Sequence, residues 1–321
     1  MRKLTLFLTL LGLGLLVALL IATDFNQVVN TFRNLKPIHL FGLIGLQFVT
    51  IALLSLQWKL LSFHLGMYLK YSVVFEMNMV SKFYESITPA LKSGGEAAKI
   101  YYLKTRGQPV KNGATLIMIQ KFISMSVFIA VLITVVLLSF MSGFGLNNMR
   151  HILPTLGIFL LVIGMVFIFL VTYIKKNKNN HETFAHTIST SLNHASAYKF
   201  SFLIHLSIAA LIWGLYGLKT LYVVHSLGYN LSYLFSTLTT FSAYLVSMVP
   251  LTPGGLGTFE ATFVALLPQF GIASGAALVI VVTLRMATFW FQLAFSGLFL
   301  LSKHIFKRWR AFRLNKIDAK Q

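Results

Sequence analysis

Long hydrophobic runs dominate the pattern of this chain, and the longest approach or exceed the length that crosses a lipid bilayer. A transmembrane α-helix needs about 20 consecutive, mostly apolar residues. About six runs meet this requirement and predict full transmembrane helices; they cover residues 4–22, 38–58, 112–140, 153–174, 202–224 and 272–301. The predicted fold is therefore an all-α polytopic integral membrane protein. One transmembrane domain is expected over residues 1–302, followed by a basic tail over residues 303–321.

An interrupted segment lies between the apolar residues 231–249 and 261–270, and residues 247–260 read SMVPLTPGGLGTFE. Proline lacks a backbone N–H and clashes with the preceding helical turn, and glycine adopts conformations that other residues avoid. Non-helical backbone at membrane depth must be buried in protein or line a wet cavity. We therefore expect a broken, functional element, with a surface loop between two spans as the alternative. The residues expected to break the helix are Pro250, Pro253, Gly254, Gly255 and Gly257.

A fainter copy of this motif occurs in the first half of the chain, where residues 86–96 read SITPALKSGGE. Both copies contain Ser-x-x-Pro, then a Gly-Gly pair, then a glutamate. This alignment places Pro89 opposite Pro250 and pairs the two Gly-Gly dipeptides. The expected structural residues of the first copy are Pro89, Gly94 and Gly95.

Composition restricts the class of protein and the available chemistry. The chain is 57% hydrophobic and 11% charged, whereas a soluble protein carries about 25% charged residues. It contains no cysteine, which excludes disulfides and thiolate chemistry. The net charge of +20 would suggest nucleic acid for a soluble chain, but here the basic residues cluster at the ends of spans. We therefore expect anionic membrane phospholipid as the partner, and no nucleic acid.

The distribution of Lys and Arg predicts how the chain is oriented in the cytoplasmic membrane. Basic residues collect at the N-terminus, in residues 59–111 and 175–199, and in the tail, so both termini are predicted to be cytoplasmic. The basic residues inside spans are Lys121, Lys219 and Arg285. Residues 59–111 then begin and end inside, while residues 228–271 begin and end outside. The two motifs are thus predicted on re-entrant hairpins from opposite faces, as in an inverted repeat with a binding site near the midplane.

Arg285 is the candidate residue with the clearest physical argument. It lies near the centre of the last apolar run, where a charged side chain costs roughly 2.5–3.5 kcal/mol on the insertion scale. The functional interpretation is an anion clamp, because a guanidinium binds phosphate through two parallel hydrogen bonds. The structural alternative is a buried ion pair with Glu260 or Glu96, and the two are compatible if the pair opens for a lipid phosphate. Polar residues follow on the same helical face: Thr288, Gln292 and Ser296.

Further polar residues extend this candidate site. Glu96 and Glu260 close the two motifs and, paired with Lys121 and Arg285, are interpreted as gates. Lys121 is alternatively an end residue whose side chain reaches the interface. A second polar face either lines a path or forms bonds between helices; it comprises Ser236, Thr240, Tyr244 and Ser247. The candidate substrate-binding or gating residues are Arg285, Glu260, Glu96, Lys121, Thr252 and Gln292.

The sequence contains no pattern typical of an active site. His181, His186 and His194 have spacings that match no common metal motif. No nucleophile accompanies the carboxylates, and no glycine-rich phosphate loop or nucleophile elbow is present. We therefore predict no catalytic residue, no metal and no cofactor. The oligomeric state is not defined by the sequence.

With these residues identified, the chain resembles the membrane domain of the lysylphosphatidylglycerol synthases, also called the multiple peptide resistance factor family, and its stand-alone flippase-like relatives. The resemblance covers essentially the whole chain. Its most specific part is PLTPGGLGTFE at residues 250–260, close to the family's signature. Supporting parts are Pro89 with Gly94-Gly95-Glu96 and the following Lys99, together with Arg285. The chain departs from the family at Gln120-Lys121-Phe122, where relatives often have an acidic residue beside an arginine.

This resemblance implies movement of aminoacylated phosphatidylglycerol, or a related lipid, between leaflets. Full-length members also carry a cytosolic domain that transfers lysine from lysyl-tRNA to phosphatidylglycerol. The chain ends shortly after its last predicted span, so we expect no transferase domain and no lysyltransferase activity from it alone. The alternatives are a membrane component that works with a separate lipid-modifying enzyme, and a scaffold or regulator that transports nothing.

Overall fold

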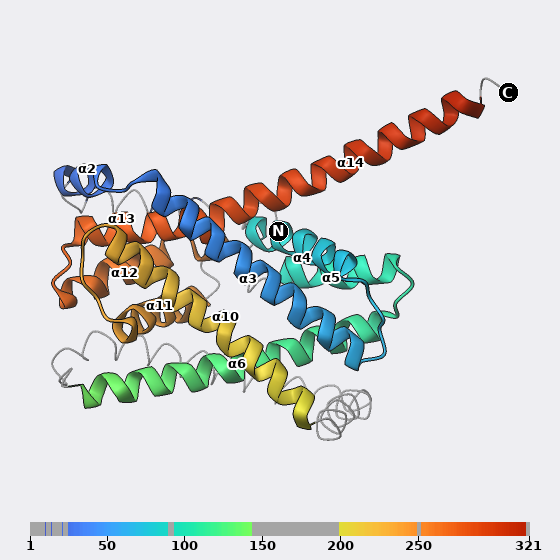
Figure 1. The fold of residues 1–321 in the computed structure, drawn as a ribbon. Coiled ribbons are helices and arrows are strands. Elements are labelled where there is room, and N and C mark those ends of the chain that lie inside the picture. Colours follow the sequence, from blue (N-terminus) through green and yellow to red (C-terminus); the bar gives the residue numbers. More distant parts are fainter. Residues whose placement is uncertain are drawn as a thin grey trace.

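The computed structural model of this 321-residue chain describes residues 25–88, 93–142, 199–248 and 252–318, together with Leu10, Gly14 and Ile21. Every regular element within these residues is a helix (Figure 1). Four helices are long and apolar enough to cross a membrane: Pro37–His64, Val110–Met141, Phe202–Ser226 and Ser274–Lys303. They confirm four of the predicted spans. The other two predicted spans, at residues 4–22 and 153–174, lie almost wholly outside the described residues.

The same order of elements occurs twice along the chain: a long helix, two short helices, then a long helix. The first set is α3 (Pro37–His64), α4 (Tyr71–Ile87), α5 (Ser93–Thr105) and α6 (Val110–Met141). The second set is α10 (Lys199–Ser226), α11 (Tyr233–Ser247), α12 (Thr258–Leu266) and a last long helix made of α13 (Ser274–Arg285) and α14 (Phe291–Asp318). A separate short helix, α2 (Phe25–Arg33), precedes α3 and packs against α13.

Matching glycine caps end corresponding helices in the two sets. Gly66 and Gly228 each stand two residues after a 28-residue helix, with φ of 73° and 84°. Gly107 and Gly271 end the second short segment of each set, with φ of 78° and 77°. Left-handed backbone of this kind is the usual end of a helix at glycine. The repetition therefore extends to the backbone conformation of the connections.

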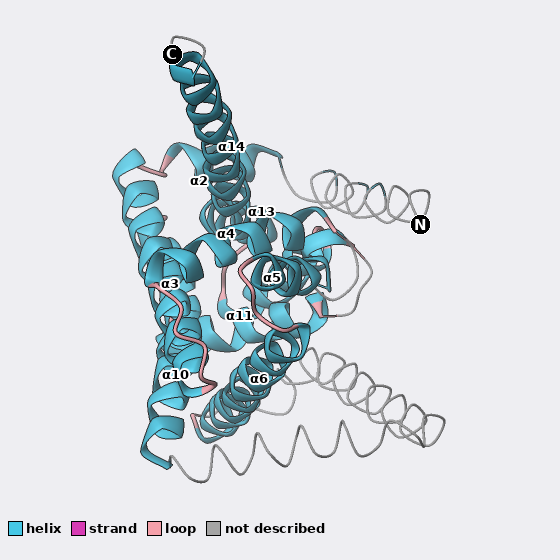
Figure 2. Cartoon of the chain, turned by 90° about the vertical axis from the view of Figure 1, so that its right-hand side faces the viewer, coloured by secondary structure: helices cyan, strands magenta, loops and turns pink. Residues whose placement is uncertain are grey.

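The two pairs of short helices occupy opposite ends of the bundle (Figure 1). The α4–α5 pair links the end of α3 to the start of α6, and the α11–α12 pair links the end of α10 to the start of α13. Each pair packs in its own hydrophobic core. In the view turned by 90°, the short helices α4, α5 and α11 lie in the middle. The long helices α3 and α10 lie to their left, α14 above them and α6 below them (Figure 2). The inverted repeat, with hairpins that enter the membrane from opposite faces, stays a prediction.

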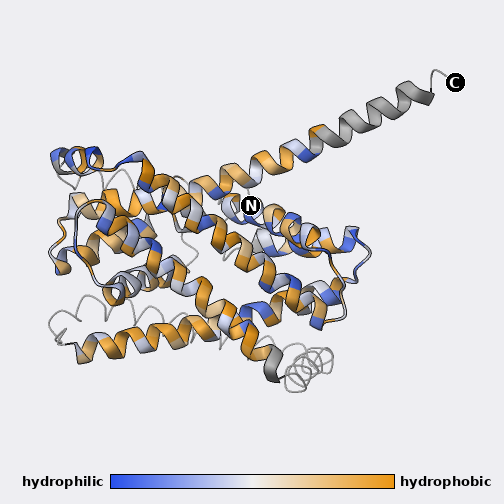
Figure 3. Cartoon of the chain, viewed as in Figure 1, coloured by the Kyte–Doolittle hydropathy of each residue, from blue (hydrophilic) through white to orange (hydrophobic). Residues whose placement is uncertain are grey.

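Three of the four long helices leave most of their apolar surface exposed. They are hydrophobic along most of their length, and polar residues gather at their ends and on α2 (Figure 3). Only 28% of the most apolar window of α3 is buried, and 33% of that of α6. A helix that is apolar around its circumference and exposed to the outside is suited to lipid rather than water. The chain is therefore an integral membrane protein.

The last predicted span is not one regular helix, which corrects the expectation for residues 272–301. After Arg285 the chain forms a π-helical turn, η4 (Met286–Trp290), before α14 begins. Such π-turns occur frequently at functional sites. In addition, α14 continues as a helix to Asp318, so most of the predicted basic tail is helical.

Candidate functional site

The second motif forms the turn between α11 and α12. A short 3-10 segment, η2 (Pro253–Gly255), is followed by Gly257 at the start of α12. Gly254, Gly255 and Gly257 have φ of 62°, 66° and 82°, a region that costs other L-residues roughly 1–2 kcal/mol. A Cβ on Gly254 would also overlap the ring of Phe289. The motif is therefore a broken helix, as predicted; Pro250 lies outside the described residues.

Thr252 closes this turn from its other side. Its Oγ1 donates a hydrogen bond of 2.7 Å to the carbonyl oxygen of Leu256, and its side chain is buried. The hydroxyl thus satisfies a backbone group that the broken helix leaves without a helical partner. In this state Thr252 supports the turn, and its predicted role in substrate binding or gating stays a prediction.

Arg285 and Glu260 form an ion pair in the interior, at the turn. The Nε of Arg285 donates to the Oε1 of Glu260 at 2.8 Å, and its Nη2 donates to the carbonyl oxygen of Gly254 at 2.9 Å. The other carboxylate oxygen of Glu260 accepts the backbone N–H of Gly257 at 2.7 Å. Only 7% of Arg285 and 2% of Glu260 is exposed. The ion-pair alternative is therefore present, and the phosphate clamp stays a prediction.

Aromatic rings enclose the guanidinium of this pair. Its central carbon lies 4.8 Å from the ring centroid of Phe259 and 4.8 Å from that of Phe289. A cation over an aromatic face gains more when both are shielded from water. Phe259 belongs to α12 and Phe289 to the π-turn. The guanidinium of Arg285, which contacts both rings, therefore holds the broken hairpin against the last long helix.

The first motif brings together the other predicted pair. Glu96, in the first turn of α5, contacts Lys121 of α6 as an ion pair. This pair is more open than the first: 29% of the Glu96 side chain and 50% of the Lys121 side chain is exposed. Pro89 lies outside the described residues. Lys99, one turn after Glu96, is buried with its Nζ 3.8 Å from the ring centroid of Trp58.

Gly94 and Gly95 do not break a helix, so the expectation that the two glycine pairs are equivalent is wrong. Both lie inside the first turn of α5 without positive φ. A Cβ on Gly95 would lie 2.8 Å from the backbone oxygen of Ser81, and one on Gly94 would overlap Thr88. Their lack of a side chain allows α5 to pack closely on α4.

The two ion pairs are equivalent under a different alignment of the halves. A shift of 164 positions, the difference between residues 260 and 96, places Glu96 on Glu260 and Lys121 on Arg285. The same shift maps Thr88-Pro89 onto Thr252-Pro253, Gly107 onto Gly271, and the start of α6 onto that of α13. The alignment of Pro89 with Pro250 is therefore displaced by three residues.

The equivalent pairs lie at similar depth from opposite ends of the bundle. Lys121 is eleven residues into α6 and Arg285 eleven residues into α13, which is about 16 Å along a helix. The turn η2 also contacts α4 of the first hairpin. The broken element of one half thus meets a short helix of the other half inside the bundle.

The polar face of the last helix reaches other helices mainly through Gln292. Its Oε1 accepts a hydrogen bond of 3.2 Å from Nε2 of Gln47 on α3. Thr288 and Ser296 instead bond to carbonyl oxygens of their own helix. On the other predicted polar face, Thr240 contacts Thr220 of α10 at 2.6 Å between hydroxyl oxygens. This contact is a bond between helices, and a polar path there stays a prediction.

Lys219 is a buried charged residue that the sequence did not assign to the site. It lies on α10 with none of its surface exposed, and its Nζ donates to Oε1 of Gln47 at 2.6 Å. The available signal was a single lysine within an apolar span. It joins Gln47 and Gln292 in a polar layer between α3, α10 and α14.

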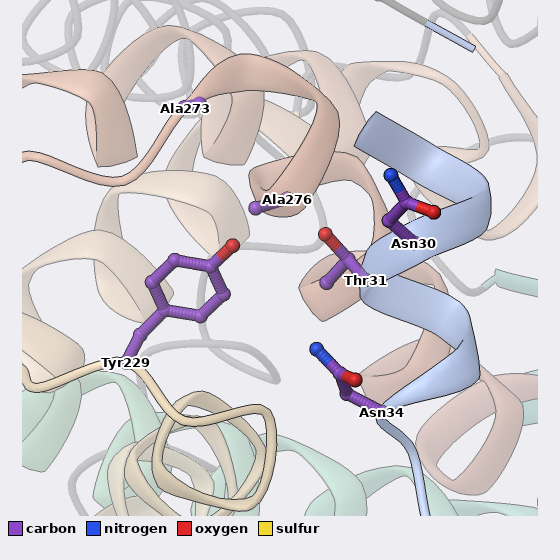
Figure 4. A pocket seen from close by; sticks show the side chains of 6 residues that line it. All are labelled: Asn30, Thr31, Asn34, Tyr229, Ala273 and Ala276. Carbon is purple, nitrogen blue, oxygen red and sulfur yellow. The ribbon is translucent and has the colours of Figure 1, made fainter. Parts of the chain in front are cut away.

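A separate cavity of about 320 Å³ lies between α2, the loop after α10 and the start of α13 (Figure 4). Amide and hydroxyl groups form its polar wall; the lining residues are Asn30, Thr31, Asn34, Tyr229, Ala273 and Ala276. None of these carries a charge, so the cavity offers no counter-charge for a phosphate. Across the ranges that the structure describes, no group of three or more metal-binding side chains occurs. His181, His186 and His194 lie outside those ranges.

Comparison with known proteins gives one consistent result. A family model described as the transmembrane region of lysylphosphatidylglycerol synthase matches residues 6–296. Similar proteins include UPF0104 membrane proteins of Methanothermobacter thermautotrophicus, 23% identical over 88% of this chain and 90% of that protein, and of Pyrococcus horikoshii, 21% identical over 92% and 96%. One from Methanocaldococcus jannaschii is 25% identical over 70% of this chain and 97% of its own length. No solved structure matches the chain.

Proposed function

Because the chain belongs to the lysylphosphatidylglycerol synthase transmembrane family, we propose that it moves anionic phospholipid between the leaflets of the cytoplasmic membrane. The substrate would be an aminoacylated phosphatidylglycerol or a related anionic lipid. Lipid translocation requires a polar headgroup to cross a region where unpaired charge is expensive. A polar, charged interior between helices supplies such a route.

The observation that carries this proposal is the pair of broken hairpins at opposite ends of one bundle. Each has a carboxylate in its second helix and a basic partner eleven residues into the next long helix. In transporters built from inverted repeats, substrate binds where discontinuous helices of both halves meet. Contact between η2 and α4 brings parts of both hairpins together in this chain.

In this proposal the hairpins are re-entrant and both termini are cytoplasmic. The α4–α5 hairpin then opens toward the cytoplasm and the α11–α12 hairpin toward the outside. Glu260 holds Arg285 while no lipid is bound, and a headgroup phosphate replaces Glu260 on the guanidinium. Opening costs less when the incoming anion restores the lost charge pairing.

The test is a leaflet-resolved assay with purified protein in liposomes. Labelled phosphatidylglycerol is placed in the outer leaflet, and its removal by an impermeant quencher or extractant is followed with time. Reconstituted protein should accelerate equilibration over protein-free liposomes, and do so less for a neutral diacylglycerol. Equal slow rates with and without protein would contradict the proposal.

A second candidate function follows from the family description. Because the matching model is a synthase's transmembrane region, the chain could instead present lipid to a separate lipid-modifying enzyme. This role needs the same interior site without exchange between leaflets. Cross-linking of the chain to such an enzyme, with no leaflet exchange in liposomes, would favour it.

A further inference from the structure

Lys219 is a buried cation to which the proposed exchange at Arg285 gives no role. Its side chain lies wholly inside the bundle, on a helix that is long and apolar enough to span the membrane. The Nζ donates to Oε1 of Gln47 at 2.6 Å and to Oγ1 of Thr50 at 2.7 Å. It also lies 4.6 Å from the ring centroid of Tyr216.

These contacts suit the charged form of the amine. The hydroxyl of Thr50 donates to the carbonyl oxygen of Leu46, and Nε2 of Gln47 donates to Gln292. Both neighbours therefore offer acceptors to Lys219 and use their own donors elsewhere. A neutral amine would need a donor for its lone pair, whereas an ammonium needs acceptors or an aromatic face. The surroundings are built for an ammonium.

No carboxylate contacts this ammonium among the described residues. The ion pairs found there use other cations, including Arg285 with Glu260 and Lys121 with Glu96. An ionisable residue inside a membrane bundle is expensive to keep and usually has a partner or a function. The missing negative charge is therefore expected to arrive with a ligand.

The layer around Lys219 contains groups that bind anions. The amide groups of Gln47 and Gln292 join α3 to α14 beside it. Gln292 follows Arg285 by seven positions, just beyond the π-turn of the last helix. An anion leaving Arg285 along this helix would meet the amide of Gln292, then that of Gln47 and the ammonium that Gln47 contacts.

We propose that Lys219, with the amides of Gln47 and Gln292, forms a second station for the phosphodiester of an anionic lipid. The inference rests on the proposed function, since it places this station on the same route as Arg285. A lipid phosphate is favoured over a free anion because acyl chains keep it at membrane depth, where hydrated ions do not partition. Thr50, the other hydrogen-bond acceptor of Lys219, stabilises the ammonium in the absence of lipid.

The test compares Lys219→Gln with Lys104→Gln, a change at an exposed lysine of α5. Purified protein in detergent is titrated with dioctanoyl phosphatidylglycerol, dioctanoylglycerol and inorganic phosphate, with binding followed by calorimetry and by the shift in melting temperature. We expect phosphatidylglycerol to bind the wild type and Lys104→Gln equally, and Lys219→Gln at least tenfold more weakly. Without ligand, Lys219→Gln should melt no lower than the wild type, because it removes an uncompensated charge.

Three results would overturn the inference. Equal binding of phosphatidylglycerol to Lys219→Gln and wild type would remove Lys219 from the site. A lower melting temperature with unchanged binding would make the lysine structural. Binding of inorganic phosphate but not the lipid would overturn the lipid assignment. Leaflet exchange is measured separately: Lys219-dependent binding without exchange keeps the site and refutes the proposed function.

Discussion

The two equivalent ion pairs predict losses of stability of very different size for the same substitution. Glu260→Gln keeps an oxygen that can accept from Gly257 and Arg285, but removes the negative charge beside a guanidinium that is 7% exposed. Removing one partner of a buried ion pair costs about 3–5 kcal/mol. Glu96→Gln makes the same change where the lysine partner is 50% exposed. Solvent screening limits that loss to about 0–1 kcal/mol.

The measurement is the free energy of unfolding in mixed detergent, extrapolated linearly to zero denaturing detergent for each variant. The single variant Arg285→Gln and the double variant Glu260→Gln with Arg285→Gln complete the cycle. The double variant should recover at least 2 kcal/mol relative to Glu260→Gln, because no uncompensated buried charge remains. Equal losses for Glu260→Gln and Glu96→Gln would refute the argument that burial distinguishes the pairs. Additive single and double losses would refute the pairing itself.

Further predictions concern the turn, the topology and the chemistry. Gly254→Ala should destabilise the protein more than Gly66→Ala, since both have positive φ but only Gly254 faces a ring, that of Phe289; thermal unfolding measures the difference. Single cysteines at Gly228 and Gly271 should both react with an impermeant thiol reagent from outside, and labelling from opposite sides would contradict the orientation. Arg285→Lys keeps the charge but loses the planar fork, so it should express normally and slow lipid exchange at least tenfold. Purified chain given lysyl-tRNA and phosphatidylglycerol should form no lysylphosphatidylglycerol, which mass spectrometry of the lipids would detect.

Much of the fold could be predicted because each membrane span is a local property of the sequence. Four apolar runs became four long helices, since lipid imposes a minimum length on any apolar helix that crosses it. The break before α12 was also local, because proline and glycine act through their own backbone. The contact of Arg285 with Glu260 was one of two ion pairs that the sequence offered as an alternative to a phosphate clamp, because a charged side chain inside a membrane is costly without a partner and the chain has few carboxylates.

The register of the repeat could not be chosen correctly from the letters of the motifs. The two Gly-Gly pairs look alike but have different tasks: Gly95 allows close helix packing, whereas Gly255 takes up positive φ. Matching the glycine pairs is a shift of 160 positions and matching Pro89 with Pro250 a shift of 161, so both miss the shift of 164 that relates the ion pairs. Glu96 and Lys121 are 25 positions apart, as are Glu260 and Arg285. This equal spacing gives the alignment of the two halves, but it could be recognised only after the structure showed that each glutamate pairs with that cation.

The polar layer around Lys219 could not be predicted from the pattern of residues along the chain. Its acceptors, Gln47 and Thr50, are 172 and 169 positions away in the chain. Helical periodicity shows which residues share one face, but not which faces meet across a bundle. The π-turn after Arg285 was missed for a related reason, since it adjusts the helix to its neighbours rather than following from its own residues.

The central claim is that the broken hairpin around η2 carries lipid between leaflets, and one measurement tests it most directly. Equilibration of labelled phosphatidylglycerol is timed in liposomes that contain either wild-type protein or the double variant Pro253→Ala with Gly254→Leu. The wild type should accelerate equilibration strongly. The variant, whose leucine would occupy the space of the Phe289 ring, should reduce the rate to that of protein-free liposomes while remaining folded by thermal unfolding. A folded variant that equilibrates lipid as fast as the wild type would contradict the claim.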